Sequence, residues 1–216
     1  MRIFVTGGSG FVGGHVIEAL ALEHEVVAMA RSERSAALVE GYGARAVRCS
    51  LDDVDASHLE GVDVVVHAAA SVEEYGPRSA YEQANIEGTR RMLAAAKAAG
   101  ATRFIQVSSN ATVFDGAGQL DVDESASYTQ LPHFHYGQTK AASEALVLEA
   151  NTAGFTTLAL RPCFVWGPRD NSVQPALVRM VEEGSFVWIG GGRARVSTTH
   201  VAELVHAVAC ALTRGV

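Results

Sequence analysis

Cysteine is scarce in this sequence, and long apolar runs are missing from it. The three cysteines among 216 residues, Cys49, Cys163 and Cys210, lie far apart and form no CxxC pair. This pattern favours reduced thiols in a cytoplasmic protein over a disulfide framework. No apolar run approaches the roughly 18 residues that a membrane span requires. Because strand-like residues stand at the start of the sequence, we also expect a soluble protein without a signal peptide.

Positive charge is scarce as well. Lysine and arginine together number 17 against 24 acidic residues, which gives a formal net charge of −7. The basic residues are scattered, so nothing indicates a surface for the phosphate backbone of a nucleic acid. The one close histidine pair, His133 and His135, has no cysteine or acidic residue at a recognised ligand spacing, and we expect no metal site. We interpret His67, at the end of an apolar run, as a packed, hydrogen-bonded residue rather than a proton shuttle.

Short β-branched runs alternate with longer alanine-rich segments along most of the chain. This alternation predicts βαβ units and an α/β fold, a doubly wound parallel sheet covered on both faces. The predicted strands are residues 2–6, 25–30, 46–49, 63–67, 103–108 and 156–160. The predicted helices lie near residues 11–22, 34–40, 54–59, 80–99, 136–153, 175–183 and 201–212.

A glycine-rich turn follows the first predicted strand and opens the first predicted helix. Its glycines fit GxGxxG at positions 8, 10 and 13, and they fit GxxGxxG at positions 7, 10 and 13. Glycines at these places let the turn close and let the backbone approach a pyrophosphate, which the helix N-terminus can bind. Strand, turn and helix in this order are typical of a dinucleotide-binding Rossmann domain, although a merely tight turn is the alternative. The predicted phosphate contacts are Gly7, Gly10, Phe11, Val12 and Gly13.

The end of the second predicted strand indicates which dinucleotide binds. NAD-binding proteins usually carry an acidic residue there, whereas this chain has Ala30, followed by Arg31 and Arg34. The small residue leaves space, and the two arginines can pair with a 2′-phosphate. This arrangement favours NADP over NAD. The alternative is that both arginines are solvated and that Glu33 binds the ribose of NAD.

Tyr136 and Lys140 stand four residues apart in a predicted helix, so their side chains should lie on one face, one turn apart. A neighbouring ammonium favours the charged form of a phenol and brings its pKa closer to neutral pH, which suits acid–base catalysis. The alternative is that Lys140 pairs with Glu144 on an exposed helix face. Ser109 ends a predicted strand at the sheet edge where such folds bind ligands, and its hydroxyl can donate to a substrate oxygen.

With these motifs together, the chain resembles the extended short-chain dehydrogenase/reductase family, also described as NAD-dependent epimerase/dehydratase proteins. The resemblance rests on the glycine turn, the strand VVVH before three alanines, the NIEGT segment, the Ser-Ser strand end, the YxxxK helix and the later RP, GP and THV segments. It implies that Tyr136 is the general acid/base, that Lys140 holds the nicotinamide ribose and that Ser109 orients the reacting carbonyl or alcohol. Asn85 would stabilise its helix and a water near the site. Further cofactor contacts would be Leu51, Asp52, Ala68, Ala69, Ala70, Pro162 and Val165.

The resemblance also implies how the chain is organised. Residues 1–162 would form the dinucleotide-binding Rossmann domain, and residues 163–216 would begin a substrate-binding region that family members complete. Helices equivalent to residues 80–99 and 136–153 commonly build a homodimer in the family. The spacing after Ser109 is more similar to the hydroxysteroid-dehydrogenase-like and the cinnamoyl or flavonoid reductase-like branches than to sugar-nucleotide epimerases. The segment Tyr75-Gly76-Pro77 also resembles the hydroxysteroid-dehydrogenase-like branch.

We therefore predict an NAD(P)-dependent oxidoreductase that interconverts a secondary alcohol and a carbonyl of a small-molecule substrate by hydride transfer. The first alternative is a nucleotide-sugar epimerase or dehydratase that uses the same Tyr136 and Lys140 but retains NAD tightly. The second alternative is a dinucleotide-binding sensor without catalysis.

Overall fold

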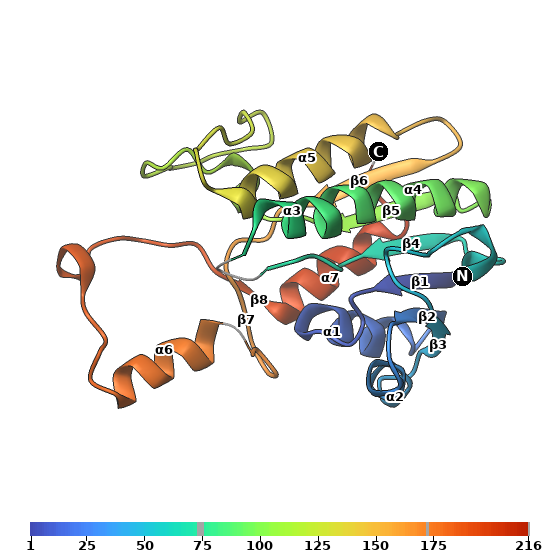
Figure 1. Ribbon diagram of the computed structural model, residues 1–216, viewed down its shortest axis with the longest axis horizontal. Coiled ribbons are helices and arrows are strands. Elements are labelled where there is room, and N and C mark those ends of the chain that lie inside the picture. Colours follow the sequence, from blue (N-terminus) through green and yellow to red (C-terminus); the bar gives the residue numbers. More distant parts are fainter. Residues whose placement is uncertain (73–75, 172, 216) are drawn as a thin grey trace.

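A parallel sheet forms the centre of the computed structural model, which describes residues 1–72, 76–171 and 173–215 (Figure 1). Within those residues, its six strands are β1 (Arg2–Thr6), β2 (Glu25–Ala30), β3 (Arg45–Arg48), β4 (Val64–His67), β5 (Arg103–Val107) and β6 (Thr156–Leu160). The strand order is β3-β2-β1-β4-β5-β6, and every neighbouring pair is parallel. The order reverses between β1 and β4, which is where open α/β sheets bind ligands. The predicted Rossmann-type α/β fold is confirmed.

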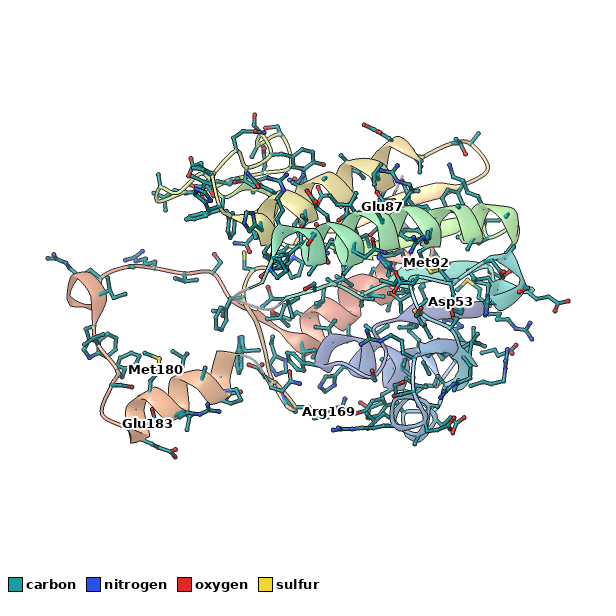
Figure 2. The ribbon with its side chains drawn as sticks, viewed as in Figure 1. Asp53, Glu87, Met92, Arg169, Met180 and Glu183 are labelled. Atoms are coloured by element: carbon teal, nitrogen blue, oxygen red, sulfur yellow. The ribbon has the colours of Figure 1, made fainter. Side chains whose placement is uncertain are left out.

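Helices cover both faces of this sheet. On one face, α1 (Phe11–Leu20), α2 (Glu33–Gly41) and α7 (Val201–Ala211) share a core with Ile3 and Val5 of β1. On the other face, α4 (Gly88–Ala98) and α5 (His135–Glu149) share a core with Phe4. Because successive residues of a strand point to opposite faces, one apolar strand supplies both cores. Met92 of α4, labelled in Figure 2, is fully buried in the second core.

Two predicted helices differ from the structure. The prediction over residues 80–99 corresponds to α3 (Arg78–Tyr81), a π-helical turn η2 (Glu82–Glu87) and α4 in succession. A π turn has i→i+5 hydrogen bonds, which no pattern of apolar residues predicts, and such turns are frequent at functional sites. The prediction over residues 54–59 corresponds to a single 3₁₀ turn, η1 (Ala56–Leu59), which Asp55 caps through its carboxylate.

The last quarter of the chain leaves the sheet and returns to it. Two short strands that the sequence pattern does not predict, β7 (Val165–Trp166) and β8 (Thr199–His200), pair with each other. Between them, α6 (Val173–Glu182) and the 3₁₀ segment η4 (Ile189–Gly192) extend away from the sheet (Figure 1). Figure 2 shows Met180 and Glu183 on this extension, apart from both cores. Its exposed apolar residues include Leu177, Val178, Val181, Val187, Trp188 and Ile189.

Two expectations from the sequence remain as they stood. The domain boundary predicted between residues 162 and 163 stays a prediction. The resemblance of the Tyr75-Gly76-Pro77 segment also stays an expectation, because Tyr75 lies outside the described residues. None of the described helices combines the length and the apolar character needed to cross a membrane.

Candidate active site

The glycine-rich turn packs against the segment that follows β4. Gly7 adopts a φ of +70°, and a Cβ atom there would lie 2.8 Å from the backbone of Ala68. A Cβ atom on Gly13 would lie 2.2 Å from the carbonyl oxygen of Gly7. Both positions therefore require glycine. Their packing brings the start of α1 beside the end of β4, where the sheet order reverses.

Helix α1 begins directly at this turn. Its N-cap, Gly10, has no side chain that could bond to the first turn. The Gly10 N–H donates to the Gly7 carbonyl oxygen at 3.0 Å. The first N–H groups of a helix carry a positive partial charge and need acceptors, which a phosphate can provide. Phe11 and Val12 are the first residues of the helix, and both are partly buried. The structure thus places the five predicted phosphate contacts in one turn.

A buried chain of hydrogen bonds joins β1, β4 and the helical segment behind the turn. The Thr89 hydroxyl donates to the Asn85 carbonyl at 2.6 Å, so it accepts from His67 Nε2 at 3.0 Å. His67 Nδ1 then accepts from the Thr6 hydroxyl at 2.8 Å, and Thr6 Oγ1 accepts from Ala69 N–H at 3.1 Å. Burial is the main cause that lowers the pKa of His67 to about 3. The neutral ring is therefore a hydrogen-bonded link that positions the segment after β4.

Asn85 lies in the π turn and is 2% exposed. Its amide binds the backbone of Ser71, which follows Ala68–Ala70: Ser71 N–H donates to Oδ1 at 2.8 Å, and Nδ2 donates to the Ser71 carbonyl at 3.3 Å. Nδ2 also donates to the hydroxyl of Thr139, at 3.1 Å. Asn85 therefore ties the segment after β4 to α5.

Ser109 and Tyr136 meet at the carboxyl edge of the sheet. Ser109 follows β5 as the N-cap of the 3₁₀ turn η3 (Asn110–Val113), and its Oγ accepts from Ala111 N–H at 3.2 Å. Tyr136 is the second residue of α5 and is partly buried. Burial raises the pKa of the Tyr136 phenol, and a hydrogen bond with the Ser109 side chain offsets part of that rise. The packing of η3 against α5 thus brings the two predicted residues to the same edge of the sheet.

Lys140 lies one turn further along α5 and is 2% exposed. Its Nζ donates to the carbonyl of Val107 at 2.8 Å. Burial lowers the pKa of Lys140 to about 8, and the negative charge of Glu144 opposes that shift. The expectation that Lys140 lowers the pKa of Tyr136 stays a prediction, because burial and Ser109 are the causes that act on this phenol here. The ammonium bonds to the backbone of β5, while burial of the phenol raises the Tyr136 pKa.

The alternative that Lys140 pairs with Glu144 on an exposed helix face is wrong about the face, because both side chains are buried. The Glu144 side chain is fully buried, and its Oε1 accepts from Arg161 Nε at 2.8 Å and Nη2 at 2.6 Å. Tyr128 donates its hydroxyl to the same oxygen at 3.1 Å, and the Ser108 hydroxyl donates to Oε2. The sequence signal that could have found this cluster is the four-residue spacing itself, because it puts Glu144 on the buried face that carries Lys140.

A model of the NAD dependent epimerase/dehydratase family matches residues 3–216. The chain belongs to this family. The 4-hydroxy-2-methyl-3-oxo-4-farnesyl-3,4-dihydroquinoline-1-oxide ketoreductase of Stigmatella aurantiaca is 39% identical over 100% of this chain and 65% of its own length. The 3 beta-hydroxysteroid dehydrogenase/Delta 5-->4-isomerase of Mycobacterium tuberculosis is 32% identical over 95% of this chain and 58% of its own length. The chain therefore spans less than two thirds of these curated relatives.

Among solved structures, MoeE5 in complex with UDP-glucuronic acid and NAD superposes with a TM-score of 0.83 at 27% identity, over 100% of this chain and 73% of that one. The resemblance inferred from the motifs is thus confirmed in sequence and in fold. The remaining predicted contacts can be placed within this epimerase/dehydratase fold.

At the end of β2, the epimerase/dehydratase chain presents two exposed arginines. Ala30 is buried, whereas Arg31 and Arg34 are exposed beside it. The carboxylate of Glu33 forms an ion pair with Arg48 at 3.2 Å. Glu33 is therefore an acidic residue close to the end of β2, but its carboxylate pairs with Arg48 of β3 in this structure.

The segment after β3 is fixed to the π turn and α4. Asp52 Oδ1 accepts from Gln83 Nε2 at 2.8 Å and from Arg91 Nη1 at 3.1 Å. Leu51 packs so closely on α4 that a Cβ atom on Gly88 would lie 2.8 Å from its Cδ1. These bonds hold one oxygen of the Asp52 carboxylate, while the side chain stays 70% exposed, and the predicted cofactor contacts of Leu51 and Asp52 stay predictions.

The segment after β6 crosses from the site to α1. The Pro162 carbonyl accepts from Asn110 N–H at 3.1 Å, and Val165 opens β7. Further on, the Pro168 carbonyl accepts a hydrogen bond from His15 Nε2 at 2.8 Å. The Arg169 guanidinium donates to both carboxylate oxygens of Glu18, at 2.8 and 2.6 Å. Sequence reasoning missed these contacts because their partners lie some 150 residues apart.

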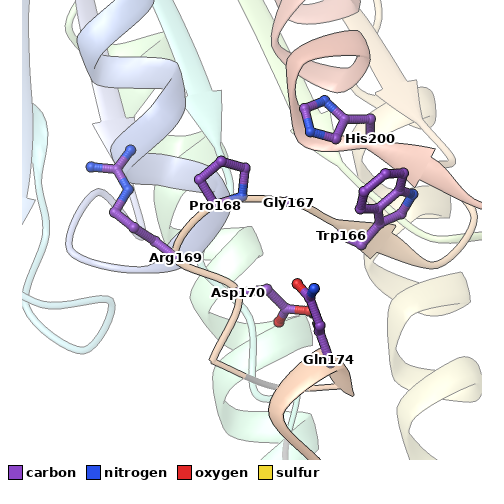
Figure 3. Close-up of a pocket in the computed structure, with 7 residues that line it drawn as sticks. All are labelled: Trp166, Gly167, Pro168, Arg169, Asp170, Gln174 and His200. Carbon is purple, nitrogen blue, oxygen red and sulfur yellow. Dashed lines mark hydrogen bonds between the residues drawn. The ribbon is translucent and has the colours of Figure 1, made fainter. Parts of the chain in front are cut away.

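A cleft of about 340 Å³ opens beside this crossing segment (Figure 3). The Arg169 guanidinium points away from it, while the Asp170 and Gln174 side chains point toward each other. The Trp166 and His200 rings meet edge to face, with centroids 4.8 Å apart. The lining residues are Trp166, Gly167, Pro168, Arg169, Asp170, Gln174 and His200.

Proposed function

We propose that this chain is the cofactor-binding and catalytic part of an NAD(P)-dependent oxidoreductase that interconverts a secondary alcohol and a ketone. The observation that carries the proposal is that Ser109, after β5, and Tyr136, at the start of α5, come together at the carboxyl edge of the sheet, where η3 packs against α5. The ketoreductase and the hydroxysteroid dehydrogenase among the relatives support it, because their names describe reactions at a ketone or an alcohol.

The residues around the β1–α1 turn fit a dinucleotide. Gly7 and Gly13 are pressed against neighbouring backbone, and the first turn of α1 has no side-chain cap, so its amides can receive the phosphates. The segment Ala68–Ala70 is held by Thr6 through Ala69 and by Asn85 through the following Ser71. It would border the cofactor, as would Pro162 and Val165. When bound, the nicotinamide supplies or accepts the hydride that moves to or from the substrate carbon.

The chain's own residues would orient the substrate and move the proton. Ser109 would donate a hydrogen bond to the substrate oxygen, and Tyr136 would give that oxygen a proton in reduction or remove it in oxidation. The raised pKa of Tyr136 keeps the phenol protonated at neutral pH, which suits the reductive direction. An ammonium has three N–H donors, so Lys140 retains two beyond its bond to Val107 with which to hold the nicotinamide ribose.

NADP is the cofactor that we propose over NAD. The exposed Arg31 and Arg34 follow the buried Ala30 after the end of β2, where a 2′-phosphate would lie. The pairing of Glu33 with Arg48 supports this choice, because a carboxylate bonded to an arginine is less available to ribose hydroxyls.

A homodimer is part of the proposal. Helices α4 and α5 contact each other, and their outer surfaces include the exposed residues Ala94, Ala98 and Leu148. Small and apolar residues allow two such helix pairs to approach closely.

The second candidate function is a nucleotide-sugar epimerase or dehydratase. The superposition on MoeE5, whose structure holds UDP-glucuronic acid and NAD, favours it specifically. Retention of the cofactor distinguishes the two candidates: purified protein with stoichiometric NAD that does not exchange would favour the epimerase or dehydratase.

The test is the oxidation of NADPH and NADH in the presence of a panel of ketones. Tyr136→Phe should lower kcat by about a hundredfold or more, because general acid–base catalysis contributes about 10²–10⁴-fold, and should leave the Kd for NADPH within about twofold. Tyr42→Phe, at the C-cap of α2, is the matched control and should leave both unchanged. Wild-type protein that binds NADPH but consumes it with no ketone would contradict the proposal and favour a sensor.

A further inference from the structure

The buried carboxylate of Glu144 has no part in the proposed mechanism, yet donors from three other parts of the chain surround it. Arg161, after β6, contributes Nε and Nη2 at 2.8 and 2.6 Å, and Tyr128 contributes its hydroxyl at 3.1 Å. Ser108, after β5, donates to the other oxygen. Both oxygens are therefore bonded, and the positive charge of Arg161 balances the buried negative charge.

Stability alone does not account for such a cluster. Replacing a buried ion pair by apolar residues of similar volume is often neutral or stabilising, although removing one partner is costly. An ion pair with a planar guanidinium adds direction, because its N–H groups fix the angle and distance at which the carboxylate lies. The Glu144–Arg161 pair is therefore suited to hold its two backbone segments in one relative position.

Two of the donors stand next in sequence to residues of the proposed site. Ser108 precedes Ser109, and Arg161 precedes Pro162. The carboxylate itself projects from α5, two turns after Tyr136. One buried carboxylate thus connects the segment that would orient the substrate oxygen, the segment that would border the nicotinamide and the helix that carries the acid/base.

Tyr128 adds the irregular segment before α5 to this cluster. Its ring lies 5.6 Å from the Arg161 guanidinium carbon, and the next residue, Thr129, donates its N–H to Thr112 at 2.7 Å. Burial and the charge of Glu144 raise the pKa of Tyr128, so its hydroxyl remains a donor. Tyr128 therefore joins the irregular segment before α5 to the same carboxylate.

We propose that Glu144 is a positioning residue of the oxidoreductase. Its carboxylate, held by Arg161, sets the distance between the Ser109 hydroxyl and the Tyr136 phenol. Through Tyr128, it also holds the substrate-side segment in place. This inference rests on the proposed function, because the turnover of a ketone is what reports whether Ser109 and Tyr136 are correctly positioned.

The test separates position from charge. Arg161→Lys keeps a positive charge but cannot reproduce the Nε and Nη2 bonds, and it should lower kcat by about tenfold or more, since a misplacement of about 1 Å can cost about 10²-fold. The Kd for NADPH should stay within about twofold. Arg2→Lys is the matched control: it changes an arginine paired with Glu25 at 2.9 Å at the amino edge of the sheet and should leave kcat unchanged.

Tyr128→Phe tests the substrate side. Loss of its hydroxyl should raise KM for a ketone by about tenfold and leave kcat within about twofold, because a hydrogen bond to a charged group is lost. Ser108→Ala removes one donor without changing a charge, and it keeps the test available if Arg161→Lys does not fold. Its kcat should fall by about fivefold.

Thermal unfolding of each variant distinguishes the possible outcomes. Variants that lose thermal stability but keep wild-type kcat and KM would show an ion pair that only stabilises the fold, and that result would overturn the positioning role while leaving the proposed function intact. Wild-type protein that binds NADPH and reduces no ketone would overturn the proposed function, and the positioning role with it.

Discussion

Replacing Gly13 by alanine tests the dinucleotide site most directly. The added Cβ atom would lie 2.2 Å from the Gly7 carbonyl oxygen, 2.6 Å from the Gly7 carbonyl carbon and 2.9 Å from the Gly8 Cα atom. All three are backbone atoms, so no side chain can rotate away to make room. Since non-bonded atoms prefer about 3.5 Å or more, the turn and the start of α1 must separate by about 1 Å.

That separation has two measurable costs. Overpacking of this kind destabilises a fold by about 1–3 kcal/mol, and in a chain of this size each kcal/mol lowers Tm by about 2–4 °C. The amides of the first turn would also move out of hydrogen-bond range of the phosphates. Losing two charge-assisted hydrogen bonds, at about 1.5–3 kcal/mol each, should raise the Kd for NADPH by about a hundredfold or more.

Gly41→Ala is the matched control. Gly41 is the last residue of α2, and a Cβ atom there meets no atom of the described structure within 4 Å. Alanine should stabilise the protein by about 0.5–1 kcal/mol at this position and leave NADPH binding unchanged. Fluorescence titration with NADPH and calorimetric unfolding measure both effects. Gly13→Ala protein that bound NADPH with wild-type affinity would refute the placement of the phosphates at this turn.

Two further predictions concern charged groups. The pKa of Lys140 falls from 10.5 to about 8 on folding, so the unfolded chain binds more protons between these values, and the free energy of urea unfolding should rise with pH across that window. Lys140→Met should lose this rise, and a flat wild-type profile would contradict a buried ammonium. Arg31→Ala and Arg34→Ala should each raise the Kd for NADPH by about tenfold and leave that for NADH within about twofold. Arg45→Ala on β3 is the control, and equal losses for both dinucleotides would argue against a 2′-phosphate site.

Most of the fold was predictable because its signals are local. The run Val64–His67 is apolar and β-branched, as a strand buried on both faces must be, and the glycine turn after β1 specifies how the first helix begins. The π turn Glu82–Glu87 was not predictable. Its backbone hydrogen bonds skip one residue more than those of an α-helix, and the contacts of Asn85 with Ser71 and Thr139 come from distant parts of the chain.

The candidate site was predictable only in part. Spacing placed Tyr136 and Lys140 on one helix face, but it could not tell which atoms the ammonium would meet or that burial would raise the pKa of the phenol. The four-residue spacing also allowed the alternative of an exposed Lys140–Glu144 pair, because spacing alone does not say which face of α5 is buried. The partner of Glu144, Arg161, comes from the far end of a later strand, so only the folded chain reveals the pair.

The extension that carries α6 leaves the sheet at Trp166 and returns at Thr199, next to Val165 in the same two-stranded pair. Both of its ends are therefore fixed at a single point on the protein, whatever the length of chain between them. The entropy cost of closing a loop grows only slowly with loop length, so insertions there disturb the rest of the chain little. We therefore expect that the part of this stretch beyond Arg169, which includes α6, can change in length while the six-stranded sheet keeps its shape.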